Sequence, residues 1–116
     1  MKPSAIFVID TDPRASGRPA EAVRIAAGVG VWRRIEVAVY LRGAAVLILG
    51  ENTDELVDSE NYTRYVPILG ELGRPIYVQK GASCLAQLGQ SALPFQEISD
   101  AALAQLAAER SRVIRF

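Results

Sequence analysis

The sequence contains no histidine and only one cysteine, Cys84, in 116 residues. Catalysis by a Ser–His or Cys–His pair is therefore excluded, because no imidazole is present to act as the base. A single cysteine cannot form an internal disulfide either. Aromatic residues make up only 7% of the chain, so the core must be built mainly from alanine, valine, isoleucine and leucine.

The chain also lacks a net charge and a long apolar run. Thirteen basic residues balance thirteen acidic ones, so we expect no nucleic-acid partner and no membrane partner. The longest apolar run, residues 44–49, is far shorter than the ~20 residues that span a bilayer. Met1-Lys2-Pro3-Ser4 leads into a strand-like segment without the features of a signal peptide, which predicts a cytoplasmic protein.

Apolar segments and helical segments alternate along the chain, which predicts one α/β domain over residues 1–116. Buried strands are expected at residues 4–9, 36–41, 75–80, 93–99 and 112–116. Helices are expected at residues 19–31, 59–72, 82–90 and 100–110, with Ser59, Ser83 and Ser99 as N-caps. The apolar stretch 42–50 could be a strand or a short buried helix. We favour a short helix or turn, because a strand there would make an antiparallel hairpin with the strand before it. The acidic segment after it is interpreted as a loop with a helical turn.

This order of elements predicts a flavodoxin-like fold: a five-stranded parallel sheet with helices on both faces and right-handed crossovers. Open sheets of this kind carry their functional groups at the carboxyl ends of the strands. The rule selects three loops as candidate sites, those after Asp10, Leu41 and Lys80.

The first of these loops, "DTDPRASGRP", supports several interpretations. Asp10 and Asp12 resemble the acidic opening of receiver domains and of haloacid-dehalogenase-like phosphatases, but the later residues that both families require are missing. The alternative, which we favour, is that Asp10 ends a strand and Asp12 begins a turn. Arg14 and Arg18 either bind an anion near a helix N-terminus or are ordinary solvated arginines.

Cys84 follows the third loop, in the segment "KGASCLAQLG". With Gly81 in the turn and Ser83 as N-cap, the thiol would fall in the first turn of a helix. The helix dipole and nearby Lys80 would then favour the thiolate, as in a nucleophile or a persulfide carrier. The alternative is that Cys84 packs as a small apolar residue.

The whole chain resembles the DsrE/DsrF-like family, which includes the sulfur-relay subunits TusB, TusC and TusD and the YchN-type proteins. The resemblance rests on "AIFVIDTDP", "EAVRIAAGV", "EVAVYLRGAAVLIL", "PILGELGRPIYVQKGA" and the late Gly89. It implies a five-stranded parallel sheet, a trimer or hexamer of identical chains, and sulfur transfer through a persulfide in the catalytic branch. The resemblance implies that the active cysteine of the sulfur-carrying members corresponds to a position near Gly81 in this chain. That position lies about one helical turn before Cys84.

Two functions follow as hypotheses. The first, which we favour, is a small homo-oligomeric protein without catalytic activity that presents a ligand site formed by Asp10, Arg14, Arg18, Gly81 and Ser83. The second is a persulfide carrier that uses Cys84 and Lys80 and meets a sulfur-relay partner protein. We expect no metal and no cofactor in either case. Trp32, Tyr62 and Tyr65 are expected either in subunit contacts or in the core.

Overall fold

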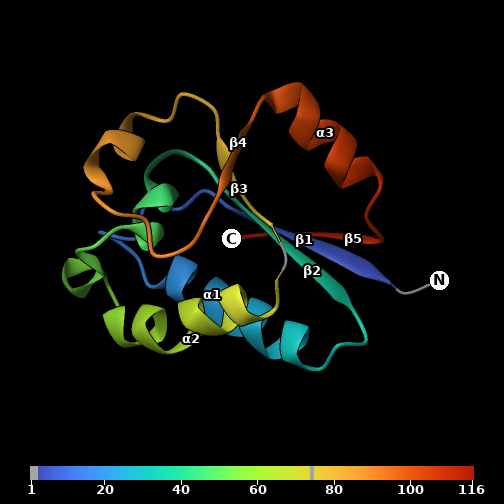
Figure 1. Cartoon of the computed structure of the whole chain (residues 1–116), viewed down its shortest axis with the longest axis horizontal. Helices are drawn as coiled ribbons and strands as arrows, with labels where there is room; N and C mark the ends of the chain where they lie inside the picture. Colours follow the sequence, from blue (N-terminus) through green and yellow to red (C-terminus); the bar gives the residue numbers. More distant parts are fainter. Residues whose placement is uncertain (1–2, 74) are drawn as a thin grey trace.

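A computed structural model describes residues 3–73 and 75–116 of the chain, so Met1 and Lys2, which we read as leading into the first strand, lie outside it. Strands and helices alternate as the sequence predicts (Figure 1). In chain order the elements are β1 (Ser4–Ile9), α1 (Arg18–Val31), β2 (Glu36–Leu41), the 3₁₀ helices η1 (Gly43–Leu49) and η2 (Thr53–Glu55), α2 (Ser59–Glu71), β3 (Ile76–Gln79), the 3₁₀ helix η3 (Ser83–Gln87), β4 (Gln96–Ile98), α3 (Asp100–Ala108) and β5 (Arg112–Arg115).

The five strands form one parallel sheet in the order β4-β3-β2-β1-β5. The chain therefore adds strands in one direction from β1 to β4 and then crosses back to place β5 on the other side of β1. The reversal lies between β1 and β5, which is the topological switch point where open α/β sheets usually bind their ligands. The predicted fold class, a five-stranded parallel sheet with helices on both faces, is confirmed.

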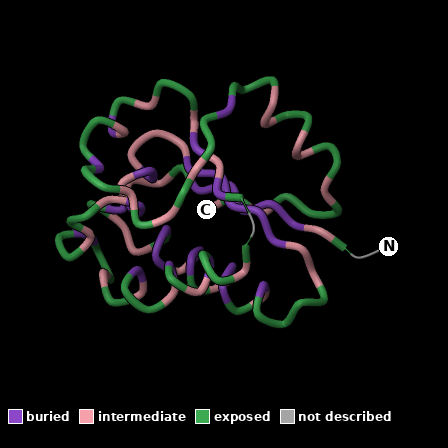
Figure 2. The backbone as a smooth tube through the Cα atoms, viewed as in Figure 1, coloured by how far each residue is buried: buried purple, intermediate pink, exposed green. Residues whose placement is uncertain are grey.

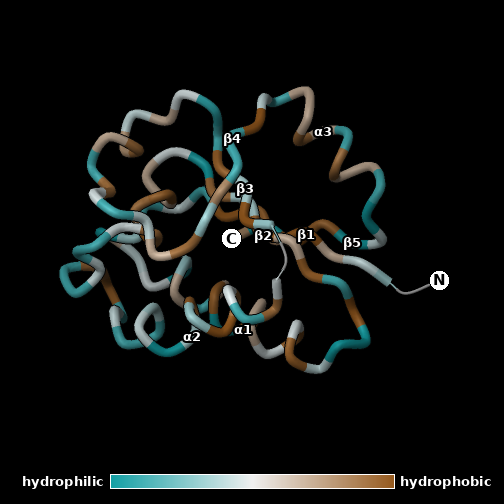
Figure 3. The backbone as a smooth tube through the Cα atoms, in the orientation of Figure 1, coloured by the Kyte–Doolittle hydropathy of each residue, from teal (hydrophilic) through white to brown (hydrophobic). Residues whose placement is uncertain are grey.

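Each face of the sheet has its own core. Along β1, Phe7 and Ile9 face α1 and α2, whereas Ile6 and Val8 face α3. The first core is the larger, and α3 covers the second as a single helix (Figure 1). Buried segments gather on the central strands and on the inner sides of α1 and α2 (Figure 2), and the same strands are the most hydrophobic (Figure 3).

Local sequence explains the long elements. Both β1 and β2 are buried on their two faces from the second residue onward, which is why they read as continuous apolar runs rather than alternating ones. In α1, Pro19 occupies the first turn, and small alanines form the buried side that rests on the sheet. Gly73 adopts a φ of 67° one residue beyond Leu72, the C-cap of α2, as expected of a glycine that ends a helix. None of the helices in the described residues combines the length and the apolar character needed to cross a membrane.

The predicted N-caps have mixed outcomes. Ser99 caps α3, since its Oγ accepts a hydrogen bond from the backbone N–H of Ala102 at 3.2 Å. Ser59 is instead the first residue of α2, and Asp58, in the left-handed region, occupies the cap position. Ser83 likewise begins η3 after Ala82 and makes no capping bond. The N-cap predictions for Ser59 and Ser83 were therefore wrong by one residue.

The helix predicted over residues 82–90 is also wrong, because only the short 3₁₀ helix η3 forms there. Gly81 and Gly89 flank the segment with φ values of 76° and 65°, which breaks helical geometry on both sides. Leu88 is held in addition by its carbonyl oxygen, which accepts a hydrogen bond from the N–H of Glu51 at 3.0 Å. By contrast, residues 43–49 form η1, as the interpretation of a short helix or turn predicted.

Candidate functional site

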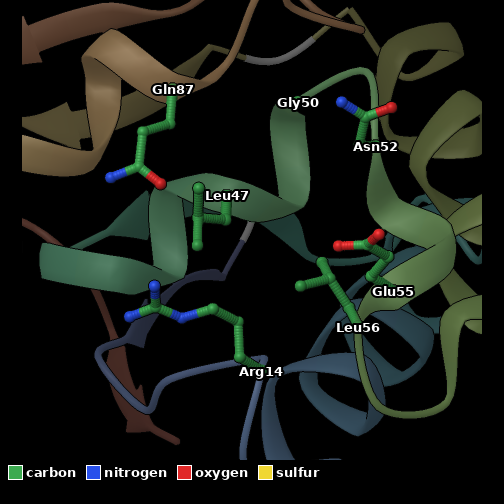
Figure 4. Close-up of a pocket in the computed structure, with 7 residues that line it drawn as sticks. All are labelled: Arg14, Leu47, Gly50, Asn52, Glu55, Leu56 and Gln87. Carbon is green, nitrogen blue, oxygen red and sulfur yellow. The ribbon is translucent and has the colours of Figure 1, made fainter.

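The three loops selected by the sheet rule meet around a hollow at the carboxyl edge of the sheet (Figure 4). Its volume is about 380 Å³, within the ordinary size range of small-molecule sites. The lining residues come from the β1–α1 loop, from η1 and the acidic segment behind it, and from η3: they are Arg14, Leu47, Gly50, Asn52, Glu55, Leu56 and Gln87.

The polar groups of the hollow are arranged in two sets. The side chains of Arg14 and Gln87 extend toward each other from opposite sides of Leu47 (Figure 4). Asn52 and Glu55 stand across the opening, beside Leu56 (Figure 4). The hollow thus offers hydrogen-bond donors from a guanidinium and amides, one carboxylate acceptor, and apolar surface from two leucines.

Arg14 is held in place by its own loop. Its Nε lies 3.0 Å from Oδ1 of Asp12 and its Nη2 lies 2.9 Å from Oδ2, so the pair is bidentate. Oδ1 of Asp12 also accepts the backbone N–H of Arg14 at 2.9 Å, and the Asp12 carbonyl accepts the N–H of Ala15 at 3.2 Å. These hydrogen bonds from Arg14 lower the pKa of Asp12. Asp12 therefore begins a turn, as we favoured, and orients a guanidinium at the rim.

Cys84 lies next to the hollow but does not line it. Its side chain is 7% exposed and belongs to the larger core. The sulfur accepts a long contact from Nε2 of Gln87 at 3.8 Å. Arg14 lies near enough to interact electrostatically with the thiol. Lys80, which the sequence predicted as the cation that favours the thiolate of Cys84, is exposed just after β3.

The other predicted ligand residues do not converge on this hollow. Asp10 is exposed, and Ser83 is exposed at the start of η3. The N–H of Gly81 turns toward β4, where it donates to Oε1 of Glu97 at 3.3 Å. Arg18 turns away from the hollow toward the carboxyl end of β5, where its guanidinium lies 5.4 Å from the ring centroid of Phe116. Only Arg14 of the predicted ligand set lines the hollow.

Sequence reasoning missed most of the lining. Asn52, Glu55 and Leu56 lie in the acidic segment that we took for a simple loop, and Gln87 lies on the segment that we took for a long helix. The position of the acidic segment in the chain was the signal that could have found these residues. Because this segment follows the second strand, the sheet rule already placed it near the carboxyl edge.

The element order and the parallel sheet define the class: a flavodoxin-like α/β domain whose largest elements all pack on one sheet. The crystal structure of the ychN protein from E. coli is similar to it over 100% of both chains, with a TM-score of 0.78 and 17% sequence identity. The fold implied by the family resemblance is thereby confirmed. No family model matches the sequence, and no curated protein matches it.

Proposed function

We propose that this protein is a DsrE/DsrF-like small oligomeric protein of the cytoplasm, which presents the carboxyl-edge hollow to a ligand and does not react through its cysteine. The full-length likeness of its fold to that of ychN supports the family assignment. The burial of Cys84 carries the choice between the two hypotheses.

A persulfide carrier needs an accessible thiolate, because the thiolate is the nucleophile and its partner must reach it. Cys84 is 7% exposed. It also sits on a five-residue 3₁₀ helix rather than on an α-helix, so it lacks the long aligned dipole that the sequence hypothesis invoked. The absence of histidine leaves no general base to compensate.

The ligand that fits the hollow is a small polar molecule rather than a simple anion. Asp12 already engages two nitrogens of Arg14, which leaves less of its charge for a ligand. Glu55 adds a carboxylate to the lining and would repel an anion. A ligand with an acceptor group for Arg14 and Gln87, and a donor or cationic group for Glu55, matches the lining best.

The persulfide carrier, working with a sulfur-relay partner protein, is the alternative. One observation favours it: the guanidinium of Arg14, a cation, lies near enough to Cys84 to interact with it electrostatically. Lys80 would assist only if its exposed side chain turned toward the thiol.

One experiment separates the two hypotheses. The native protein is incubated with a persulfide donor and its intact mass is measured, with Cys84→Ser and the urea-unfolded protein as controls. We expect modification of the unfolded protein only. A gain of one sulfur by the native protein that disappears in Cys84→Ser would establish the carrier and overturn our proposal.

The second part of the proposal is self-association. It is supported by the separation of acidic and basic residues toward opposite ends of the molecule. Residues 51–60 contain five acidic residues and no basic one. The connections before β2 and β5, taken together with the first residue of each strand, contain four arginines against two glutamates: Arg33, Arg34, Glu36, Glu109, Arg110 and Arg112. These regions lie at opposite ends of the longest dimension of the molecule, which is 40 Å (Figure 1). A neutral chain with oppositely charged ends favours head-to-tail contacts between copies.

Apolar surface accompanies the arginine-rich end. Trp32 is 62% exposed and Val31 is 55% exposed at the end of α1. A groove of about 420 Å³, lined mainly by apolar side chains, runs beside them between α1 and the β1–β5 edge. The acidic end carries Val57, which is 36% exposed. A second copy can therefore supply both the charge and the apolar contact, with its acidic segment against this end.

Light scattering at low salt and at about 1 M salt, where the Debye length falls to about 3 Å, tests the contact. We expect an oligomer that weakens with salt, with Asp54→Lys/Glu60→Lys, and with Arg33→Glu/Arg34→Glu. An equimolar mixture of the two reversed variants should associate again, and Arg64→Glu on α2 serves as the control. A monomer at every salt concentration would contradict the proposal.

A further inference from the structure

A second polar cluster lies at the carboxyl end of β2, on the opposite face of the sheet from the hollow. Alternation along β2 places Tyr40 and Arg42 on the face covered by α3. Tyr40 packs into the smaller core, whose helical side is formed by Ala102, Leu103 and Leu106 of α3. Asp100, the first residue of α3, completes the cluster.

The cluster contains more buried donors than it has partners for. Nη2 of Arg42 lies 2.6 Å from Oδ1 of Asp100. The side chain of Tyr40 is 0% exposed, and its hydroxyl is buried without a hydrogen-bond partner among the described residues. Nε of Arg42 is buried without a partner there as well. Arg42 lies near enough to Tyr40 for the phenol oxygen to accept from the guanidinium, but the Tyr40 O–H then still lacks an acceptor. Because buried polar atoms in proteins are nearly always hydrogen-bonded, this unmatched donor indicates a missing acceptor.

The electrostatic surroundings show that these groups share one place. Burial raises the pKa of Tyr40, while Arg42 acts to lower it and Asp100 to raise it. The Tyr40 hydroxyl therefore faces both partners of the ion pair. Asp100 begins α3, a nine-residue helix whose N-terminus is capped by Ser99. The positive end of that helix faces the same place.

We propose that Tyr40, Arg42 and the N-terminus of α3 form a binding site for a small tetrahedral oxoanion of the phosphate or sulfate class. In the structure the Asp100 carboxylate occupies the place of that anion, since it accepts a hydrogen bond from Arg42 at the N-terminus of α3. An oxoanion has enough acceptor positions to take the Nη2 and Nε hydrogens of Arg42 and the hydroxyl hydrogen of Tyr40 together.

Displacement of Asp100 by such an anion costs little. Its side chain is 74% exposed and that of Arg42 is 37% exposed, and exposed ion pairs contribute weakly to stability. Asp100 can turn into solvent while Ser99 keeps the cap on α3. The inference does not depend on the function proposed for the hollow, because none of these residues lines the hollow.

Titration calorimetry with inorganic phosphate and with sulfate, using chloride as the reference salt, tests the site. We expect Asp100→Ala to tighten phosphate binding about tenfold, because the competing carboxylate is gone and a charged hydrogen bond is worth about that factor. Arg42→Gln should abolish binding, and Tyr40→Phe in the Asp100→Ala background should weaken it by a similar factor.

The chain offers a matched control in Glu21 and Arg24. This pair also joins an acid in the first turn of a helix to an exposed arginine, but neither of its own side chains has a buried nitrogen or oxygen without a hydrogen-bond partner. Glu21→Ala should therefore not create phosphate binding. Equal binding by Glu21→Ala and Asp100→Ala would overturn the proposal. It would also fail if a crystal grown in phosphate contained only a water molecule between Tyr40 and Arg42.

Discussion

The rings of Phe7 and Phe116 stack with their centroids 6.1 Å apart and their planes 15° from parallel. The backbone of Phe116 continues the sheet, because its N–H donates to the carbonyl of Val8 at 2.9 Å and its carbonyl accepts the N–H of Asp10 at 3.1 Å. Phe116 thus occupies the switch point between β1 and β5 with its own side chain. The hollow is lined instead by residues from the segments that follow β1, β2 and β3.

Phe116→Ala should destabilise the fold by about 2 kcal/mol, less than the 3–5 kcal/mol typical of a fully buried phenylalanine. Phe116 is only partly buried, but it packs against Phe7 and lies under the guanidinium of Arg18. Urea unfolding followed by far-UV circular dichroism measures the change. Gln105→Ala on α3 is the control, and it should change stability by less than about 0.5 kcal/mol because Gln105 is exposed. Equal losses for the two variants would contradict the packing role of Phe116.

Two glycines in α1 should respond differently to alanine. A Cβ at Gly28 would meet nothing within 4 Å, whereas one at Gly30 would lie 2.4 Å from Cδ1 of Leu72. Gly28→Ala should therefore stabilise the protein by about 0.5–1 kcal/mol through helix propensity. Gly30→Ala should lose most of that gain because Leu72 must move out of its packing against α1. Thermal unfolding of the two variants tests the difference, and a gain at Gly30 equal to that at Gly28 would show that the packing is loose.

Stability should fall in alkaline solution because of Tyr62. Burial raises the pKa of its hydroxyl above the value of about 10 that an unfolded tyrosine has. Between these two values the folded state holds a proton that the unfolded state releases, so the free energy of unfolding decreases as pH rises above about 10. Tyr62→Phe should make the decrease shallower at pH 10–11. It should also be near neutral at pH 7, because the hydroxyl it removes is buried without a partner among the described residues. An identical pH profile would rule out Tyr62 as the source.

Cys84 should tolerate alanine better than serine. Its side chain packs in the larger core, so both changes remove apolar contact. Serine in addition buries a hydroxyl, and the contact of this site with the amide of Gln87, 3.8 Å from the sulfur, is too long for a good hydrogen bond. We expect a loss of about 1 kcal/mol for Cys84→Ala and of about 2 kcal/mol for Cys84→Ser by urea unfolding. The reverse order would mean that Cys84 faces water, which would reopen the persulfide hypothesis.

The sequence was sufficient for the elements that local pattern controls. β1 and β2 begin and end at the predicted residues, because each is an apolar run with β-branched and aromatic residues and polar neighbours, which is typical of a strand buried on both faces. The capping role of Ser99 was predictable for the same reason, since the cap depends on neighbours three residues away. Prediction failed at η3, where the contact between Leu88 and Glu51 joins segments distant in the chain.

The sequence by itself determined the alternation of strands and helices, and through it the parallel sheet and the edge at which functional groups gather. Hydrophobic periodicity and turn residues act over a few neighbouring positions, so their effect can be predicted from the sequence alone. Only the tertiary structure decided which groups at that edge meet: Arg14 with Gln87 around the hollow, and Tyr40 with Arg42 and Asp100 on the other face. It also decided that Cys84 is buried. Those outcomes depend on how distant segments pack and compete for space, which no local pattern encodes.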